Sequence, residues 1–142
     1  MPHGTAGLRV KMLRISRPIF NEMLLHAREE SPLEACGYLG GKGDIITKLF
    51  RMRNVDASEK HFSFEPEEQF ATAKKARQED LDLIAVYHSH PHSQPRPSKE
   101  DISLAYDPDL IHVILSLLPP KPIAKAFRIE EGKVAEIPLR IM

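Results

Sequence analysis

Apolar residues recur along this chain with two periods, and the changes between them mark its predicted elements. Basic and apolar residues alternate over Leu8–Ile15, which predicts a half-exposed strand at a sheet edge. Apolar residues then recur at helical spacing over Ser16–Glu30, with Pro18 in the first turn, which predicts a helix whose apolar face packs on a sheet. Residues 66–79 and a shorter segment from Ser98 to about Tyr106 also fit helices.

The remaining apolar runs fit strands. These are Cys36–Gly40, Ile45–Met52, Leu81–Tyr87, Ile111–Leu118, Ile123–Ile129 and Val134–Ile141. Glycines between the first two predict a hairpin, and the almost wholly apolar Leu81–Tyr87 predicts a central strand covered on both faces. Together they predict an α/β fold of the mixed α+β kind, in which helices pack on the faces of a mixed central sheet. We expect one domain over residues 1–142, with residues 1–7 as a loose tail.

Composition narrows the range of partners. Twenty Lys and Arg balance twenty Asp and Glu, so bulk charge predicts neither a nucleic acid nor a membrane as partner. The single cysteine, Cys36, has no partner for an internal disulfide, and its neighbours suggest a small buried apolar residue rather than a nucleophile. The longest apolar run is too short to span a bilayer, and no signal peptide precedes the first strand. We expect a cytoplasmic protein.

A metal site is indicated where the predicted central strand ends. His88 and His90 are two residues apart, so on a strand they project from the same face. A catalytic zinc site needs three protein ligands and an open fourth position. Prolines turn the following loop back toward a helix that opens at Ser98, which makes Asp101 in its first turn the candidate third ligand.

Each of these residues also has a simpler interpretation. Ser98 followed by Asp101 is an ordinary helix cap, a His-x-His pair is common on surfaces, and Glu34 alone would be a surface carboxylate. His92 is close enough in sequence to act behind the ligands or toward a substrate, and the polar segment from Asn54 is a weak hint of a loop beside a cleft. The other histidines, His3, His26, His61 and His112, lack ligand-like spacing and are expected to be structural or surface residues.

Taken together, the segment HSHPHSQPRPSKED closely resembles the signature of the JAMM, or MPN-plus, metalloprotease family: His-x-His-Pro, six residues, Ser, two residues, Asp. The upstream SPLEACGYLGG resembles the family's glutamate segment. The resemblance implies a single MPN-like domain in which His88, His90 and Asp101 bind zinc. It also implies that Glu34 is general base and then general acid on the attacking water, while Ser98 steadies the oxyanion.

The resemblance also implies a substrate class. The compact chain is similar to stand-alone prokaryotic members, which suggests cleavage of a peptide or isopeptide bond at the C-terminal tail of a ubiquitin-like or sulfur-carrier protein. A homodimer is left open. Two alternatives remain: a non-catalytic MPN scaffold, which characteristically lacks the metal ligands, and a zinc hydrolase of small amides or peptides. A zinc deaminase is disfavoured, because its His-x-Glu and Pro-Cys-x-x-Cys motifs are absent.

Overall fold

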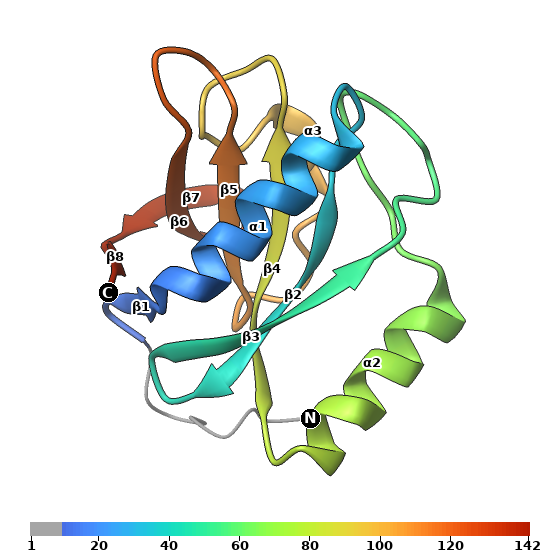
Figure 1. The fold of residues 1–142 in the computed structure, drawn as a ribbon, viewed down its shortest axis with the longest axis vertical. Coiled ribbons are helices and arrows are strands. Elements are labelled where there is room, and N and C mark those ends of the chain that lie inside the picture. Colours follow the sequence, from blue (N-terminus) through green and yellow to red (C-terminus); the bar gives the residue numbers. More distant parts are fainter. Residues whose placement is uncertain (1–9) are drawn as a thin grey trace.

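The computed structural model describes residues 10–142, which build one mixed sheet of eight strands and three helices (Figure 1). The strands are β1 (Leu13–Ile15), β2 (Cys36–Lys42), β3 (Ile45–Met52), β4 (Asp82–His90), β5 (Ile111–Ser116), β6 (Ile123–Glu130), β7 (Lys133–Ile137) and β8 (Leu139–Ile141). The helices are α1 (Arg17–Glu30), α2 (Pro66–Gln78) and α3 (Lys99–Ser103). The strand order is β7-β6-β5-β4-β2-β3-β1-β8, which confirms the predicted mixed sheet. The predicted tail, residues 1–7, lies outside the described residues.

The predicted central strand is confirmed as β4, which pairs antiparallel with β2 and parallel with β5. It is longer than predicted, because its ladder with β5 continues to His90. Every residue from Ile84 to His90 is buried, so the two histidines belong to the strand itself and share its rigidity. The β2–β3 hairpin is also confirmed. It turns through Gly43, whose φ of +61° favours glycine.

The helices divide between the two faces of the sheet. α1 crosses one face (Figure 1) and buries Ile19, Phe20, Met23 and Ala27, the spacing predicted from sequence. Tyr87 points to this face, where its hydroxyl lies 2.7 Å from Nδ1 of His26. Because neighbouring residues of a strand face opposite sides, His88 and His90 point away from α1. α2 lies on their side, where Gln69 of α2 donates a hydrogen bond to the Tyr38 hydroxyl of β2.

Two predictions about the sheet edges are wrong. β1 is not an edge strand, because β8 pairs with it on the side away from β3. The single strand predicted over Val134–Ile141 is two strands, because Pro138 interrupts it. β7 pairs with β6 at one end of the sheet order and β8 with β1 at the other, so the sheet curls until its two edges meet at Pro138. The Pro138 carbonyl there accepts a hydrogen bond from the Leu13 amide.

The third helix is shorter than predicted, since α3 ends at Ser103 rather than near Tyr106. Its few residues form barely more than one turn, stabilised at the start by Ser98. Within the described residues, no helix is both long and apolar enough to cross a bilayer.

Candidate metal centre and active site

The antiparallel pairing of β2 with β4 brings Glu34 to the two histidines. Cys36 is the register partner of His88, and one residue earlier the Ala35 carbonyl accepts a hydrogen bond from the Ser89 amide. The Ala35 amide donates in turn to Oγ of Ser89, a fully buried side chain. Glu34 therefore follows the same register beside His90, and residues directly opposite in such a pair share a face.

Glycine is required where this segment enters the sheet. A Cβ atom on Gly37 would lie 2.4 Å from the Phe50 carbonyl oxygen of β3, closer than real side chains come. Gly37, in the predicted glutamate segment, thus allows β2 to approach β3 closely three residues after Glu34.

Three potential ligand atoms converge on one point. Nε2 of His88 lies 3.1 Å from Nε2 of His90, and Oδ2 of Asp101 lies 3.2 Å from the first and 3.3 Å from the second. All three residues are buried, and they form a group that could hold a metal ion.

This triangle fits a tetrahedral ion. Ligands bonded to zinc at about 2.0–2.1 Å in a tetrahedron are separated from one another by about 3.3–3.4 Å. Two of the observed separations, 3.1 and 3.2 Å, fall just below that range and the third, 3.3 Å, lies within it. Two imidazole nitrogens with one carboxylate oxygen are also a common donor set for zinc. The His90 ring is also oriented, since its Nδ1 lies 2.8 Å from the Gln94 carbonyl and leaves Nε2 for a metal.

The first turn of α3 positions the carboxylate. Oγ of Ser98 accepts a hydrogen bond from the Asp101 amide at 3.0 Å, and Oδ2 of Asp101 accepts one from the Ser98 amide at 2.9 Å. These two hydrogen bonds form a capping box, so the simpler interpretation of Ser98 and Asp101 as a helix cap is confirmed. The cap does not prevent Asp101 from converging on the two histidines. Because Ser98 Oγ accepts in the cap, its own hydrogen stays available for another acceptor.

Burial and neighbouring groups set the protonation of the cluster. Burial raises the pKa of Glu34 to about 8, against an opposing effect of His90. Burial would also raise the pKa of Asp101, but its hydrogen bonds with His88 and His90 hold that pKa well below the usual range. Burial lowers the pKa of His88, against an opposing effect of its hydrogen bond with Asp101. For His90, hydrogen bonds to Asp101 and to the Gln94 carbonyl outweigh burial and raise the pKa.

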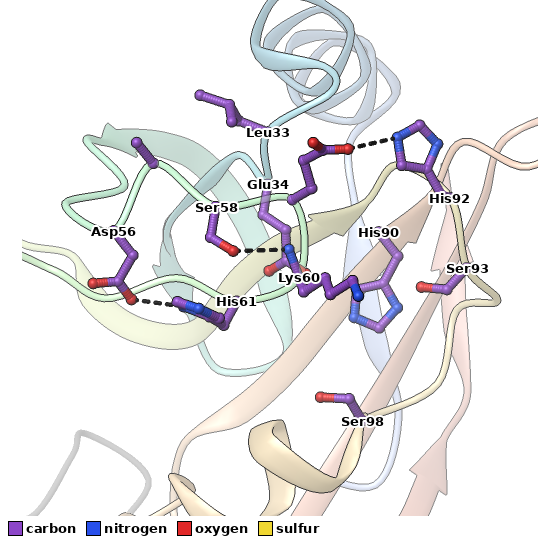
Figure 2. Close-up of a pocket in the computed structure, with 12 residues that line it drawn as sticks. Leu33, Glu34, Asp56, Ser58, Lys60, His61, His90, His92, Ser93 and Ser98 are labelled. Carbon is purple, nitrogen blue, oxygen red and sulfur yellow. Dashed lines mark hydrogen bonds and ion pairs between the residues drawn. The ribbon is translucent and has the colours of Figure 1, made fainter.

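An open pocket of about 850 Å³ gives access to this cluster (Figure 2). Glu34, His90 and Ser98 line it, together with Ser93, His92 and the loop residues Asp56–His61. The hint that the polar segment after Asn54 borders a cleft therefore fits the structure. His92, which the sequence suggested could act behind the ligands or toward a substrate, lines this pocket. Its Nε2 lies 3.4 Å from Oε1 of Glu59 on the loop.

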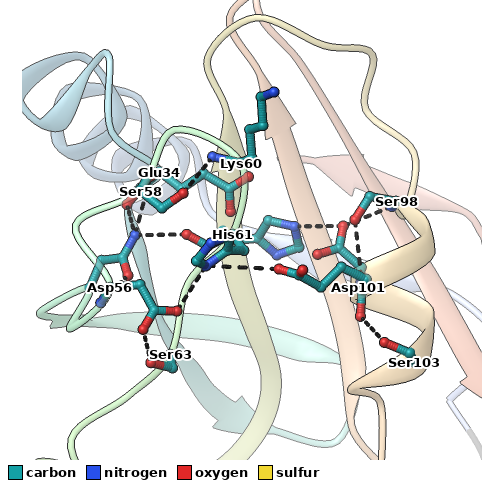
Figure 3. Close-up of polar contacts among 12 residues, drawn as sticks. Glu34, Asp56, Ser58, Lys60, His61, Ser63, Ser98, Asp101 and Ser103 are labelled. Carbon is teal, nitrogen blue, oxygen red and sulfur yellow. Dashed lines mark hydrogen bonds and ion pairs between the residues drawn. The ribbon is translucent and has the colours of Figure 1, made fainter.

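The same loop holds the backbone of Glu34 (Figure 3). These loop contacts were not predicted from the sequence. The Ser58 carbonyl accepts a hydrogen bond from the Glu34 amide at 2.8 Å, and buried Asn54 donates to the Glu34 carbonyl at 3.1 Å. The loop is braced by Asp56, which accepts from Ser63 and lies 2.9 Å from His61. These contacts join side chains to backbone over an irregular segment, so no periodic pattern predicts them.

Among the described residues, those set aside in the sequence are not members of the ligand triangle. Cys36 is buried, its Sγ donates to the Met52 carbonyl, and burial raises its pKa to about 12, which fits a small apolar residue. His26 is buried against Tyr87 on the opposite face of the sheet. His112 is half-buried on β5, and His61 belongs to the loop. His3 lies outside the described residues.

A buried carboxylate beside a three-ligand cluster in an open pocket is the arrangement of a metal-dependent hydrolase. The chain belongs to the prokaryotic homologs of the JAB domain, whose family model matches residues 16–130.

Relatives of known activity and structure agree with this family. The chain is 31% identical over 136 residues to the CysO-cysteine peptidase of Mycobacterium tuberculosis, covering 94% of this chain and 93% of that protein. It is 33% identical over 103 residues to the desampylase of Haloferax volcanii, covering 68% and 74%. The solution structure of protein DSY2949 from Desulfitobacterium hafniense superposes with a TM-score of 0.85 at 39% identity, covering 92% and 93%. The chain is a peptidase of the JAMM type.

Proposed function

We propose that this protein is a zinc-dependent metallopeptidase that cleaves a peptide or isopeptide bond at the C-terminal tail of a ubiquitin-like or sulfur-carrier protein. The observation that carries the proposal is the ligand triangle of His88, His90 and Asp101, with separations of 3.1–3.3 Å in the same pocket as Glu34. The three residues are the sequence-predicted ligands, and their convergence is what separates a peptidase from a scaffold that lacks them.

The chain's own residues divide the work. Nε2 of His88, Nε2 of His90 and Oδ2 of Asp101 would hold the zinc. When bound, zinc supplies a Lewis acid that brings the pKa of water toward neutrality and polarises a carbonyl group. Glu34 would take a proton from the attacking water at Oε1, a buried atom without a hydrogen-bond partner among the described residues, and deliver it to the leaving amine. Ser98 would donate its hydroxyl hydrogen to the carbonyl oxygen as negative charge builds there.

The substrate class rests on the relatives and on the pocket. One relative is named for CysO-cysteine and another as a desampylase, and both match most of this chain. The pocket is open, and its lining includes His90, the last residue of β4. We also place the enzyme in the cytoplasm, where the lone Cys36 would stay reduced.

Metal content is the first test. Elemental analysis of the purified protein should find about one zinc per chain, and His88→Ala and Asp101→Ala should each lose it. His92→Ala is the matched control, because this histidine lines the pocket but lies outside the triangle, and it should keep the ion. Wild-type protein without metal after incubation with zinc would contradict the proposal and favour the scaffold.

Substrate class needs a separate test. A ubiquitin-like protein fused through its C-terminal tail to a reporter should be cleaved, while a free peptide of the same tail sequence should be cleaved far more slowly. Glu34→Gln should keep zinc and lose about 10²–10⁴ in rate on the fusion, because a general base is lost. Equal cleavage of the free peptide would favour the small-amide hydrolase, and full activity of Glu34→Gln would contradict the mechanism.

A further inference from the structure

The two histidines of the triangle are held in different ways. Nδ1 of His90 has the Gln94 carbonyl at 2.8 Å, the kind of contact that normally fixes the ring of a metal-binding histidine. Nδ1 of His88 is buried and finds no hydrogen-bond partner among the described residues, and its side chain is 1% exposed. The contact of His88 Nε2 with Asp101 belongs to the ligand triangle, so within residues 10–142 no second hydrogen bond fixes the plane of the His88 ring from its Nδ1 side.

An aromatic ring lies against His88. Phe62, near the end of the loop that borders the pocket, stacks on the imidazole with centroids 4.7 Å apart and planes 28° apart. The Phe62 ring also packs near Phe64, with centroids 5.4 Å apart, and Phe64 packs near Tyr38 of β2, with centroids 5.0 Å apart. The series ends at α2, whose Gln69 donates to the Tyr38 hydroxyl.

We infer that Phe62 is a positioning residue for the metal, which orients the His88 imidazole by stacking where a second hydrogen-bond partner is missing. This inference rests on the proposed zinc site and adds a residue that neither the family signature nor the ligand triangle contains. Phe62 touches the ligand and not the substrate-binding side of the cluster, since it is not among the residues that line the pocket. It acts through His88 alone.

The inference predicts a defined effect on metal binding. Phe62→Leu should weaken zinc affinity, measured by chelator competition, by about 10-fold or more, because outer-shell partners of metal ligands typically contribute 10–100-fold. Phe62→Tyr, which keeps the aromatic face, should restore wild-type affinity. Phe62→Met provides the same comparison as Phe62→Leu should the latter fail to fold.

Phe64→Leu is the matched control, because it tests whether a loss of loop stability alone would weaken zinc binding. Phe64 belongs to the same aromatic series but has no ring contact with His88, so its loss should lower the free energy of unfolding with little change in zinc affinity. The visible spectrum of the cobalt-loaded protein adds a second measure, because it reports ligand geometry directly. That spectrum should change in Phe62→Leu and stay like wild type in Phe62→Tyr and Phe64→Leu.

Failure of the Phe62 inference can be distinguished from failure of the proposed zinc site. Wild-type protein that binds no zinc would overturn the zinc site itself, and this inference with it. Zinc bound equally well by wild type and Phe62→Leu, or equal loss of affinity in Phe62→Leu and Phe64→Leu, would overturn the role of Phe62 while leaving the zinc site intact.

Discussion

At the residue scale, the burial of Glu34 bears on its proposed role in proton transfer. Its side chain is 2% exposed, and burial raises its pKa to about 8, against an ordinary value of 4.5. The surrounding structure thus favours the protonated form. A group that must accept a proton and release it again works best when its pKa lies near the pH at which the enzyme works.

The raised pKa predicts a pH-dependent stability for protein treated with a chelator. Between about 4.5 and about 8 the folded protein retains a proton on Glu34 that the unfolded chain has lost, so this contribution is complete below 4.5 and disappears as pH rises through 8. From pH 5 to pH 8, wild type should lose ~2–4 kcal/mol more of its unfolding free energy than Glu34→Gln, since one pKa unit corresponds to about 1.4 kcal/mol. Urea unfolding measures this difference. Parallel pH profiles would show that Glu34 has an ordinary pKa.

Sequence indicated which residues converge in the candidate site, but not what surrounds them. Spacing alone placed His88 and His90 on one strand face, and the prolines after them indicated the return toward Asp101. Ser89 was missed although it lies between the two histidines, because its role depends on pairing with Ala35, fifty-four positions away. Phe62 was missed for the same reason, since its contact with His88 follows from tertiary structure.

At the scale of elements, two of the proposed ligands come from a central strand and the third from a helix of five residues. The strand is held by pairing on both sides, whereas α3 depends on its cap. In the capping box that starts α3, the Ser98 amide donates a hydrogen bond to Oδ2 of Asp101, the proposed ligand atom. Helix stability and ligand position are therefore coupled in one set of hydrogen bonds.

Substitutions of Ser98 separate its two roles. Ser98→Ala should lower the unfolding free energy by about 1 kcal/mol through loss of the cap, and should lower kcat by about 10²–10³ through loss of the hydroxyl donor. Ser98→Thr keeps a hydroxyl that can cap and donate, and should retain most of both. Zinc content is measured on the same samples. If Ser98→Ala loses activity only in proportion to the zinc it loses, Ser98 acts as a helix cap and not as a hydroxyl donor in catalysis.

At the scale of the whole molecule, the order of strands was the least predictable feature. Mixed sheet, central strand and hairpin follow from local patterns, but the wide separation of β7 and β8 in the sheet depends on long-range pairing. Pro138 did offer a signal, because proline cannot donate to a strand ladder and so interrupts the run from Val134 to Ile141. The pairing of β8 with β1 has no comparable mark in the sequence.

The pairing of β8 with β1 predicts a large effect of a small deletion. A chain ending at Ile137 would lose half-buried Leu139 and Ile141 and would expose Leu13 and Ile15, which are fully buried. The unfolding free energy should fall by about 2–4 kcal/mol, as estimated from the apolar surface uncovered. Met142→Ala, a change in a side chain that is 51% exposed, is the control and should have little effect. Equal stability of the deleted and full-length proteins would show that β8 contributes little.

The meeting of the two sheet edges also bears on how the protein is made. β1 pairs with β3, which is synthesised soon after it, and with β8, which begins at residue 139, far later than Leu13. On the ribosome, a nascent chain can form α1 and the hairpin early, but one side of β1 stays unpaired until β8 emerges. An open strand edge of that kind invites pairing with other chains. The interval between synthesis of β1 and of β8 is therefore the period in which this protein most needs protection from aggregation.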